Sequence, residues 1–170
     1  MSAVDHSIVT LRMFGDDLNP REVTKILGIT PTKAWAKGET GKHIVGPKIG
    51  DVRTAKTGMW QLCASDRKPE DIDGQIREIF NQISADVAVW QSITKKYHVN
   101  LSCGLFMSET NDGLSISPQS MAILAERGIE LWFDIYAPSE DIAPTDLCPC
   151  KSGKTYAECC APKTKTLSNT

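Results

Sequence analysis

Four cysteines near the end of the sequence carry its clearest chemistry. Cys148 and Cys150 form one close pair, Cys159 and Cys160 form another, and eight residues containing a Ser-Gly turn signal separate the pairs. The two thiols of each pair can chelate, and the turn would bring the two pairs together on the same ion. Four thiolates complete the closed tetrahedral shell of structural Zn²⁺ sites, although tetrahedral sulfur also admits iron. We therefore predict one structural zinc ion at these cysteines.

The cysteine segment has almost no apolar core, so its folding energy has to come from the metal. Apparent binding energies of zinc-finger peptides are about 10–16 kcal/mol at neutral pH. Lys151 and Lys154 would offset part of the negative charge of a four-thiolate centre and favour thiolates over thiols. Disulfide pairing is the alternative, and the lack of a signal-peptide pattern in residues 1–20 disfavours it.

The run Cys-Pro-Cys-x-Ser-Gly-Lys-x-Tyr-x-x-Cys-Cys, residues 148–160, resembles the SEC-C motif. This motif is the zinc-binding tail of the preprotein-translocase motor SecA, and it also occurs in many other bacterial proteins. Lys151 stands where the family often has glycine. In that family the motif contacts the SecB chaperone or ribosomes, so the resemblance implies zinc binding and a docking role.

The composition fits a soluble globular protein. Of 170 residues, 41% are hydrophobic and 24% charged, which disfavours a disordered or fibrous chain. No apolar stretch approaches the roughly 18 residues that a membrane span needs. We expect a cytoplasmic protein with no membrane partner, and its oligomeric state is left open.

Charge is distributed unevenly along the chain. Residues 147–170 hold four lysines against one glutamate, a charge of +3, which leaves −5 of the total of −2 for residues 1–146. Residues 33–57 form a glycine-rich, basic connection with a charge of +4, which we expect to be a long loop or hairpin. A solvated tail and loop is one interpretation; contact with RNA or a ribosome is another. The candidate basic contacts are Lys42, Lys48, Lys151 and Lys154.

Apolar periodicity and capping signals predict alternating strands and helices. Helices are expected from Asn19 to Gly28, within 69–83, from Asp86 to Tyr97, and from Ser117 to Gly128. Strands are expected at residues 8–14, 59–64, 99–107 and 129–136. The pattern predicts an α+β two-layer sandwich, a mostly antiparallel sheet with helices on one face.

The expected domain boundaries follow from composition. Residues 1–137 form the α+β domain, 138–146 are a linker with two prolines, 147–162 form the zinc knuckle, and 163–170 are a flexible tail. Within the domain, Trp35, Trp60 and Trp90 are expected in the core, and Cys103 should point inward.

Strand alternation places a second set of residues on the sheet face without helices. Aromatic and charged side chains gathered on an open face would form a binding platform, unless a terminal segment or the basic loop covers it. The candidate residues of this binding face are Arg12, Phe14, Phe106, Trp132, Asp134 and Tyr136.

Residues 5–137 resemble the bacterial domain-of-unknown-function family 4279. The resemblance rests on the segment from Phe14 to Pro20, on Gly58-Met59-Trp60, and on the closing Phe133-Asp134-Ile135-Tyr136. It implies no activity.

The preferred interpretation is a non-enzymatic adaptor whose zinc knuckle docks a protein or ribosomal partner. An alternative is a hydrolase or transferase that uses Asp16, Asp17, Arg12 and Asp134, although acids just before a helix more often cap it. No catalytic residues can be assembled from the three histidines, since they lack partners at recognisable spacing. A toxin-immunity protein is a further alternative.

Overall fold

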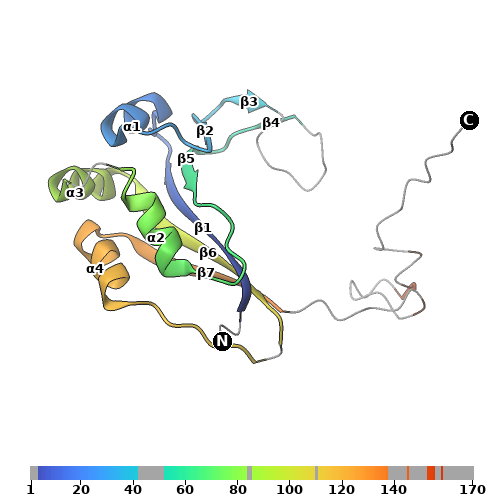
Figure 1. Cartoon of the computed structure of the whole chain (residues 1–170). Helices are drawn as coiled ribbons and strands as arrows, with labels where there is room; N and C mark the ends of the chain where they lie inside the picture. The colour runs from blue at the N-terminus through green and yellow to red at the C-terminus, as the bar shows by residue number, and fades with distance from the viewer. Residues whose placement is uncertain are drawn as a thin grey trace, which may run out of the picture. The chain divides into compact units, whose positions relative to one another are not determined.

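The computed structural model describes residues 4–41, 52–83, 86–109 and 111–137, together with residues 145, 153–155 and 158. By its contacts the chain divides into two units, Met1–Ala137 and Pro138–Thr170, and the fold described below is that of the first unit. Its strands are β1 (Val4–Gly15), β2 (Lys33–Trp35), β3 (Thr40–Gly41), β4 (Arg53–Thr54), β5 (Gly58–Cys63), β6 (His98–Met107) and β7 (Glu130–Tyr136). Its helices are α1 (Pro20–Leu27), α2 (Ile72–Phe80), α3 (Val87–Lys96) and α4 (Pro118–Arg127) (Figure 1).

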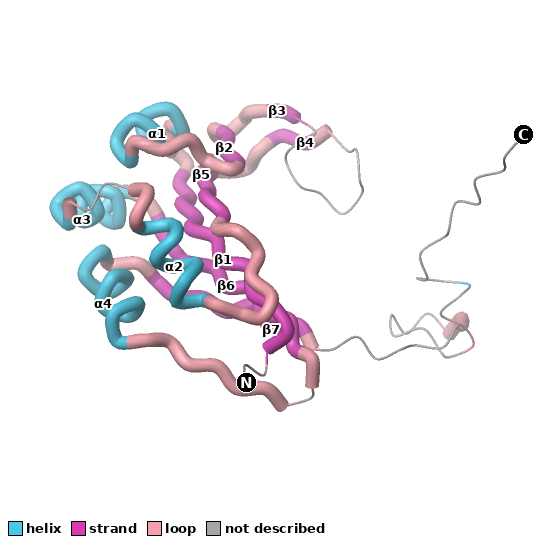
Figure 2. The backbone as a smooth tube through the Cα atoms, in the orientation of Figure 1, coloured by secondary structure: helices cyan, strands magenta, loops and turns pink. Residues whose placement is uncertain are grey.

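The main sheet has five strands in the order β2-β5-β1-β6-β7. All neighbours pair antiparallel except β6 and β7, which are parallel and are joined through α4. Helices α1, α2, α3 and α4 pack on β5, β1, β6 and β7, respectively, so all four lie on one side of the sheet (Figure 2). This is an α+β two-layer sandwich with a mostly antiparallel sheet, as the sequence predicts.

Each helix begins at a polar side chain that accepts a hydrogen bond from a free backbone N–H. The caps are Asn19, Asp71, Asp86 and Ser117. Two helices, α1 and α4, end at Gly28 and Gly128, whose left-handed backbone (φ of 72° and 66°) favours glycine. Local sequence signals therefore set these helix ends.

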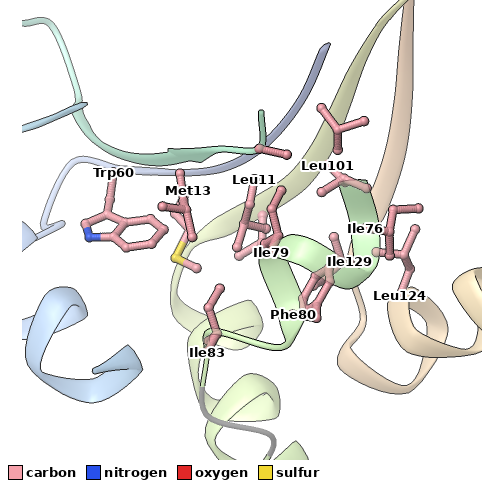
Figure 3. Close-up of a cluster of buried hydrophobic side chains, with 14 of the residues drawn as sticks. Leu11, Met13, Trp60, Ile76, Ile79, Phe80, Ile83, Leu101, Leu124 and Ile129 are labelled. Carbon is pink, nitrogen blue, oxygen red and sulfur yellow. The ribbon is translucent and has the colours of Figure 1, made fainter. Parts of the chain in front are cut away.

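The hydrophobic core lies between the helices and the inner face of the sheet (Figure 3). Leu11, Met13 and Leu101 project from β1 and β6 and are fully buried, and so is Trp60 from β5. Helix α2 contributes an apolar face to the same core, which includes Ile72, Ile76 and Ile79. Apolar side chains at helical spacing thus cover apolar side chains at strand spacing, as burial requires.

The core also contains a satisfied polar pair that links α2 to β1. Ser7 and Gln75 are both fully buried. Ser7 Oγ donates to Gln75 Oε1 at 2.6 Å, and Gln75 Nε2 donates to the carbonyl oxygens of Ser7 and Ser65, both at 2.8 Å. The backbone N–H of Asp71 donates to Ser7 Oγ at 3.2 Å. These bonds fix the start of α2 on the sheet.

The structure corrects several details of the sequence analysis. β1 begins at Val4, four residues before the expected strand, and α2 is shorter than the segment 69–83. Within residues 33–57, β3 and β4 pair as a hairpin, the second of the two expected forms, whereas the edge strand at Lys33–Trp35 was not expected. Trp35 is half-buried on that short edge strand, whereas Trp60 and Trp90 are core residues as expected.

Candidate functional site: the open sheet face and the cysteine segment

Side chains of β1, β6 and β7 that point away from the helices form the open face of the sheet. The antiparallel register sets Arg12 beside Asn100 and His6 beside Phe106, and the parallel register sets Trp132 beside Ser102 and Tyr136 beside Phe106. Trp132 and Tyr136 on the edge strand are 50% and 46% exposed. This register places the six candidate residues of the binding face on one side of the sheet. Among the described residues, no helix packs on that side.

Arg12 is held at the centre of the open face by stacking and by one hydrogen bond. Its guanidinium carbon lies 4.5 Å from the centre of the Trp132 ring and 5.7 Å from that of Phe14. Its Nε donates to Asn100 Oδ1 at 2.9 Å, whereas its buried Nη2 has no hydrogen-bond partner among the residues that the structure describes. Burial lowers the pKa of Arg12, and the charge of Asp134 opposes that change. The side chain is a cation positioned by aromatic faces.

A second aromatic group crosses the three strands at the other end of the open face. The rings of His6 and Phe106 are stacked at 4.0 Å and those of Phe106 and Tyr136 at 4.7 Å, both nearly parallel. The Tyr136 hydroxyl donates to Asp134 Oδ2 at 2.7 Å, and this hydrogen bond raises the pKa of Tyr136. The stack therefore ends in a neutral phenol at the edge of the sheet.

The sequence analysis missed His6 and Asn100 as members of this face. The signal for His6 was present, since it has the same parity as Arg12 and Phe14 along β1. Asn100 lies on a strand whose obvious apolar stripe is on the opposite side, and its role as the acceptor for Arg12 depends on register. Sequence alternation shows which residues share a face, but only pairing shows which of them meet.

Of the four residues proposed for a hydrolase or transferase, Arg12 and Asp134 share the open face and interact, whereas the other two lie outside the strands of this face. Asp16 and Asp17 lie in the turn after β1 and are exposed. Asp16 pairs with Lys37, whose hydrogen bond lowers the pKa of the Asp16 carboxyl, and Asn19 is the residue that caps α1. Within the described part of the chain, no three His, Cys, Asp or Glu side chains are grouped to hold a metal ion.

Two cysteines of the first unit are free thiols. Cys103 is buried, and burial raises the pKa of its thiol to about 12. Cys63 is half-buried on β5, where Thr10 and Gln61 each approach its Sγ at 3.5 Å. Cys103 therefore points inward and remains a neutral core side chain, as expected.

A shallow pocket of about 140 Å³ lies on the helix side, between α1 and α3. Val23, Ile26, Ile93 and Tyr97 supply its apolar lining, with Glu22 and Lys96 beside them. The sequence analysis did not predict this pocket. It contains no group of side chains that would orient a polar ligand.

The four predicted metal ligands, Cys148, Cys150, Cys159 and Cys160, lie outside the described residues, as do Lys42, Lys48 and Lys151. The described residues between the two cysteine pairs are consistent with a turn. Gly153 has a φ of 76°, and the backbone N–H of Glu158 donates to the carbonyl oxygen of Thr155 at 3.2 Å. Four thiols, two on either side of such a turn, form a donor set that suits zinc.

The fold and the cysteine segment together define a class of protein: an α+β sandwich with one open sheet face, followed by a short segment with metal-ligand spacing. The chain belongs to the family described as Domain of unknown function (DUF4279), which matches residues 5–138. A SEC-C motif matches residues 145–162. Both resemblances noted in the sequence are thereby confirmed.

No curated protein and no solved structure matches the chain. In the described part of the chain, no helix is both long and apolar enough to cross a membrane.

Proposed function

We propose that this protein is a zinc-binding adaptor. Its SEC-C segment binds one structural zinc ion and docks a protein or ribosomal partner, while the sheet face of its body contacts a second surface. The observation that carries this proposal is the SEC-C motif at residues 145–162, which contains both cysteine pairs and follows a complete folded domain.

Cys148, Cys150, Cys159 and Cys160 would hold the ion. A closed set of four thiolates leaves no position open for water or substrate, so the zinc would act structurally and not as a Lewis acid. The energy of binding would order a segment that has few apolar residues of its own. Lys151 and Lys154, between the cysteine pairs, would make the surface of the ordered knuckle basic.

The open face of the body supports an interaction role over a catalytic one. Trp132 and Tyr136 are about half exposed, and Arg12 is fixed between aromatic rings. Exposed aromatic groups with an Arg at their centre are typical of protein interfaces. Two of the carboxylates considered for an acid–base mechanism, Asp16 and Asp17, are instead exposed in the turn after β1.

The test is elemental analysis of the protein purified without added metal, beside Cys159→Ser/Cys160→Ser. Cys63→Ser is the matched control, since Cys63 lies on β5 outside the cysteine segment. We expect one zinc per chain in the wild type and the control, and its loss in the double variant while the far-ultraviolet circular dichroism of the body stays unchanged. A wild type without metal whose cysteines titrate as disulfides would contradict the zinc site.

Docking is tested separately by sedimentation of the zinc-loaded protein with purified bacterial ribosomes. We expect the wild type to co-sediment with ribosomes, or to displace from them a protein that co-sediments. We expect the zinc-free double variant to do neither. Binding that persists in the double variant would mean that the knuckle is not the docking element. Steep weakening with salt would identify contacts to RNA.

A further inference from the structure

The edge strand β7 offers an unpaired backbone along seven residues. Among the described residues it pairs only with β6, and its outer edge has no neighbour in the sheet. The opposite edge strand, β2, has only three residues. An edge strand of ordinary length with free N–H and C=O groups is a template for another extended segment. β7 is therefore the edge at which a partner strand fits.

Two carboxylates and two rings alternate along the open-face side of β7. Glu130, Trp132, Asp134 and Tyr136 all belong to this row, and all four are exposed. The Glu130 side chain is 62% exposed and lies 3.6 Å from His98 Nε2. Carboxylates attract cations, and the faces of Trp and Tyr do so as well. The row is thus suited to lysine or arginine side chains.

We propose that β7 binds a basic segment of a partner protein in extended conformation, as an added strand of the sheet. This inference deepens the proposed function, because it rests on the body having a partner and it names the chemistry of that partner. Lysine or arginine at alternate positions of the segment contact the row of Glu130, Trp132, Asp134 and Tyr136.

The spacing of strands supports this arrangement. A strand added to the edge lies about 4.8 Å from β7, and its alternate side chains lie on the same face as the row. Each cation of the segment would then be next to a carboxylate and an aromatic ring at once. The intervening side chains of the segment fall on the helix side, beside Ile135, which is 61% exposed there. The segment that fits best therefore alternates basic and apolar residues.

The charge of the molecule favours a basic segment over a second copy of this chain. Residues 1–146 carry a charge of −5. Arg12 already interacts with Asp134, so one guanidinium lies beside the two carboxylates of the row. The cation Lys33 shares this face but lies on β2, at the opposite edge of the sheet. If two copies paired antiparallel about Phe133, Glu130 would face Tyr136 and Asp134 would face Trp132, and β7 of the second copy has no Lys or Arg to set against either carboxylate. A basic segment supplies the missing charge.

The experiment measures fluorescence anisotropy of a labelled peptide of about nine alternating Lys and Val residues with the full-length, zinc-loaded protein. A peptide of alternating Glu and Val tests the charge. A third peptide has proline at two adjacent central positions and one lysine added at its end. Backbone N–H groups of successive residues in a strand point to opposite edges, so one of the two replaced residues would have donated to β7. The prolines therefore remove one hydrogen bond to β7, and the added lysine keeps the charge of the peptide unchanged.

The protein variants separate β7 from the general acidity of the body. Glu130→Gln/Asp134→Asn removes both carboxylates of the row and keeps their acceptor oxygens. Asp66→Asn/Glu22→Gln is the matched control, because it removes one Asp and one Glu from exposed positions outside β7 and outside α4, the helix that packs on it. We expect the first variant to bind the Lys-Val peptide about tenfold more weakly and the control to stay within about twofold of the wild type. Binding should also weaken between about 50 mM and about 300 mM salt.

Equal losses in the two variants, or equal affinity for the proline peptide, would overturn the proposal. A stable dimer in sedimentation velocity that the peptide does not dissociate would assign the edge to a second copy and would also overturn it. Peptide binding by Cys159→Ser/Cys160→Ser separates this inference from the zinc proposal. If the wild type holds zinc but binds no peptide, the edge proposal fails and the zinc-binding adaptor stands. If the wild type binds the peptide but holds no zinc, the edge proposal stands and the zinc-binding adaptor fails.

Discussion

At the scale of single residues, the buried polar groups of the described part of the chain are of two kinds: those with hydrogen-bond partners, and two arginine nitrogens without one, Arg12 Nη2 and Arg127 Nε. Ser7 and Gln75 bond one another and three backbone groups in the core. On the open face, by contrast, buried Nη2 of Arg12 has no hydrogen-bond partner and rests against aromatic rings. Buried donors without partners are rare. Because Arg127 Nε on α4 is another one among the described residues, the feature is not confined to the open face.

Ser7→Ala should lower the free energy of unfolding by about 1–3 kcal/mol. The substitution leaves Gln75 Oε1 without its partner in the core and removes the acceptor of the part-buried N–H of Asp71. The measurement is urea unfolding followed by circular dichroism. Ser92→Ala, at an exposed position of α3, is the control and should change stability by less than about 0.5 kcal/mol. A Ser7→Ala midpoint equal to that of the control would mean that the buried pair is not stabilising.

At the scale of elements, Asp73 joins α2 to the start of α4. Its carboxylate accepts hydrogen bonds from Ser117 N at 3.1 Å and from Ser117 Oγ at 3.0 Å, and Ser117 Oγ in turn accepts from Ser120 N. Burial raises the pKa of Asp73, but the hydrogen bonds from Ser120 and Ser117 outweigh it, and the net shift is downward. One carboxylate on α2 therefore positions the helix that leads into β7.

Asp73→Asn should destabilise the protein by about 1–2 kcal/mol at neutral pH, because charge-assisted hydrogen bonds to the cap of α4 are weakened. A folded-state pKa below the ordinary value of 3.8 means that this contribution is complete above about pH 4 and is lost as the pH falls through the lowered value. Urea unfolding at neutral pH and at about pH 3 should therefore show that the difference in free energy of unfolding between wild type and variant is smaller in acid. A difference that grows in acid would contradict this assignment.

At the scale of the whole molecule, the body has a complete core of its own and the SEC-C segment follows it. The buried cluster runs from Val4 to Ile129 and draws on the main sheet and all four helices. Every member of this cluster that the structure describes belongs to the first unit, Met1–Ala137. Stability of the body should thus be independent of any metal held by the cysteines.

Removal of metal with a chelator should leave the free energy of unfolding of the body, measured with urea, unchanged within about 0.5 kcal/mol. A chain ending at Ala137 should have the same free energy of unfolding. The indole fluorescence of buried Trp60 and Trp90 reports on the body, because both side chains belong to its core. In the same samples the chelator should release the zinc. A drop of several kcal/mol on chelation would instead show that the two units share their stability.

The sequence by itself determined the features that depend on neighbours along the chain. Capping residues and glycine ends predicted α1 and α4 almost to the residue, and period-two alternation predicted the inward Cys103 and the outward Trp132. These signals act over a few residues, where side-chain direction follows backbone geometry. The cysteine spacing belongs to the same group, since chelation by a close pair is local.

Tertiary structure alone decided what depends on pairing between distant segments. Arg12 and Trp132 meet because β6 lies between β1 and β7, and His6 joins Phe106 and Tyr136 for the same reason. The short strand β2 and the position of β7 at the edge also follow from strand order. Alternation shows which face a residue occupies but not which strand lies beside it, because many orders bury the same apolar stripes and only the packing of the whole core selects one.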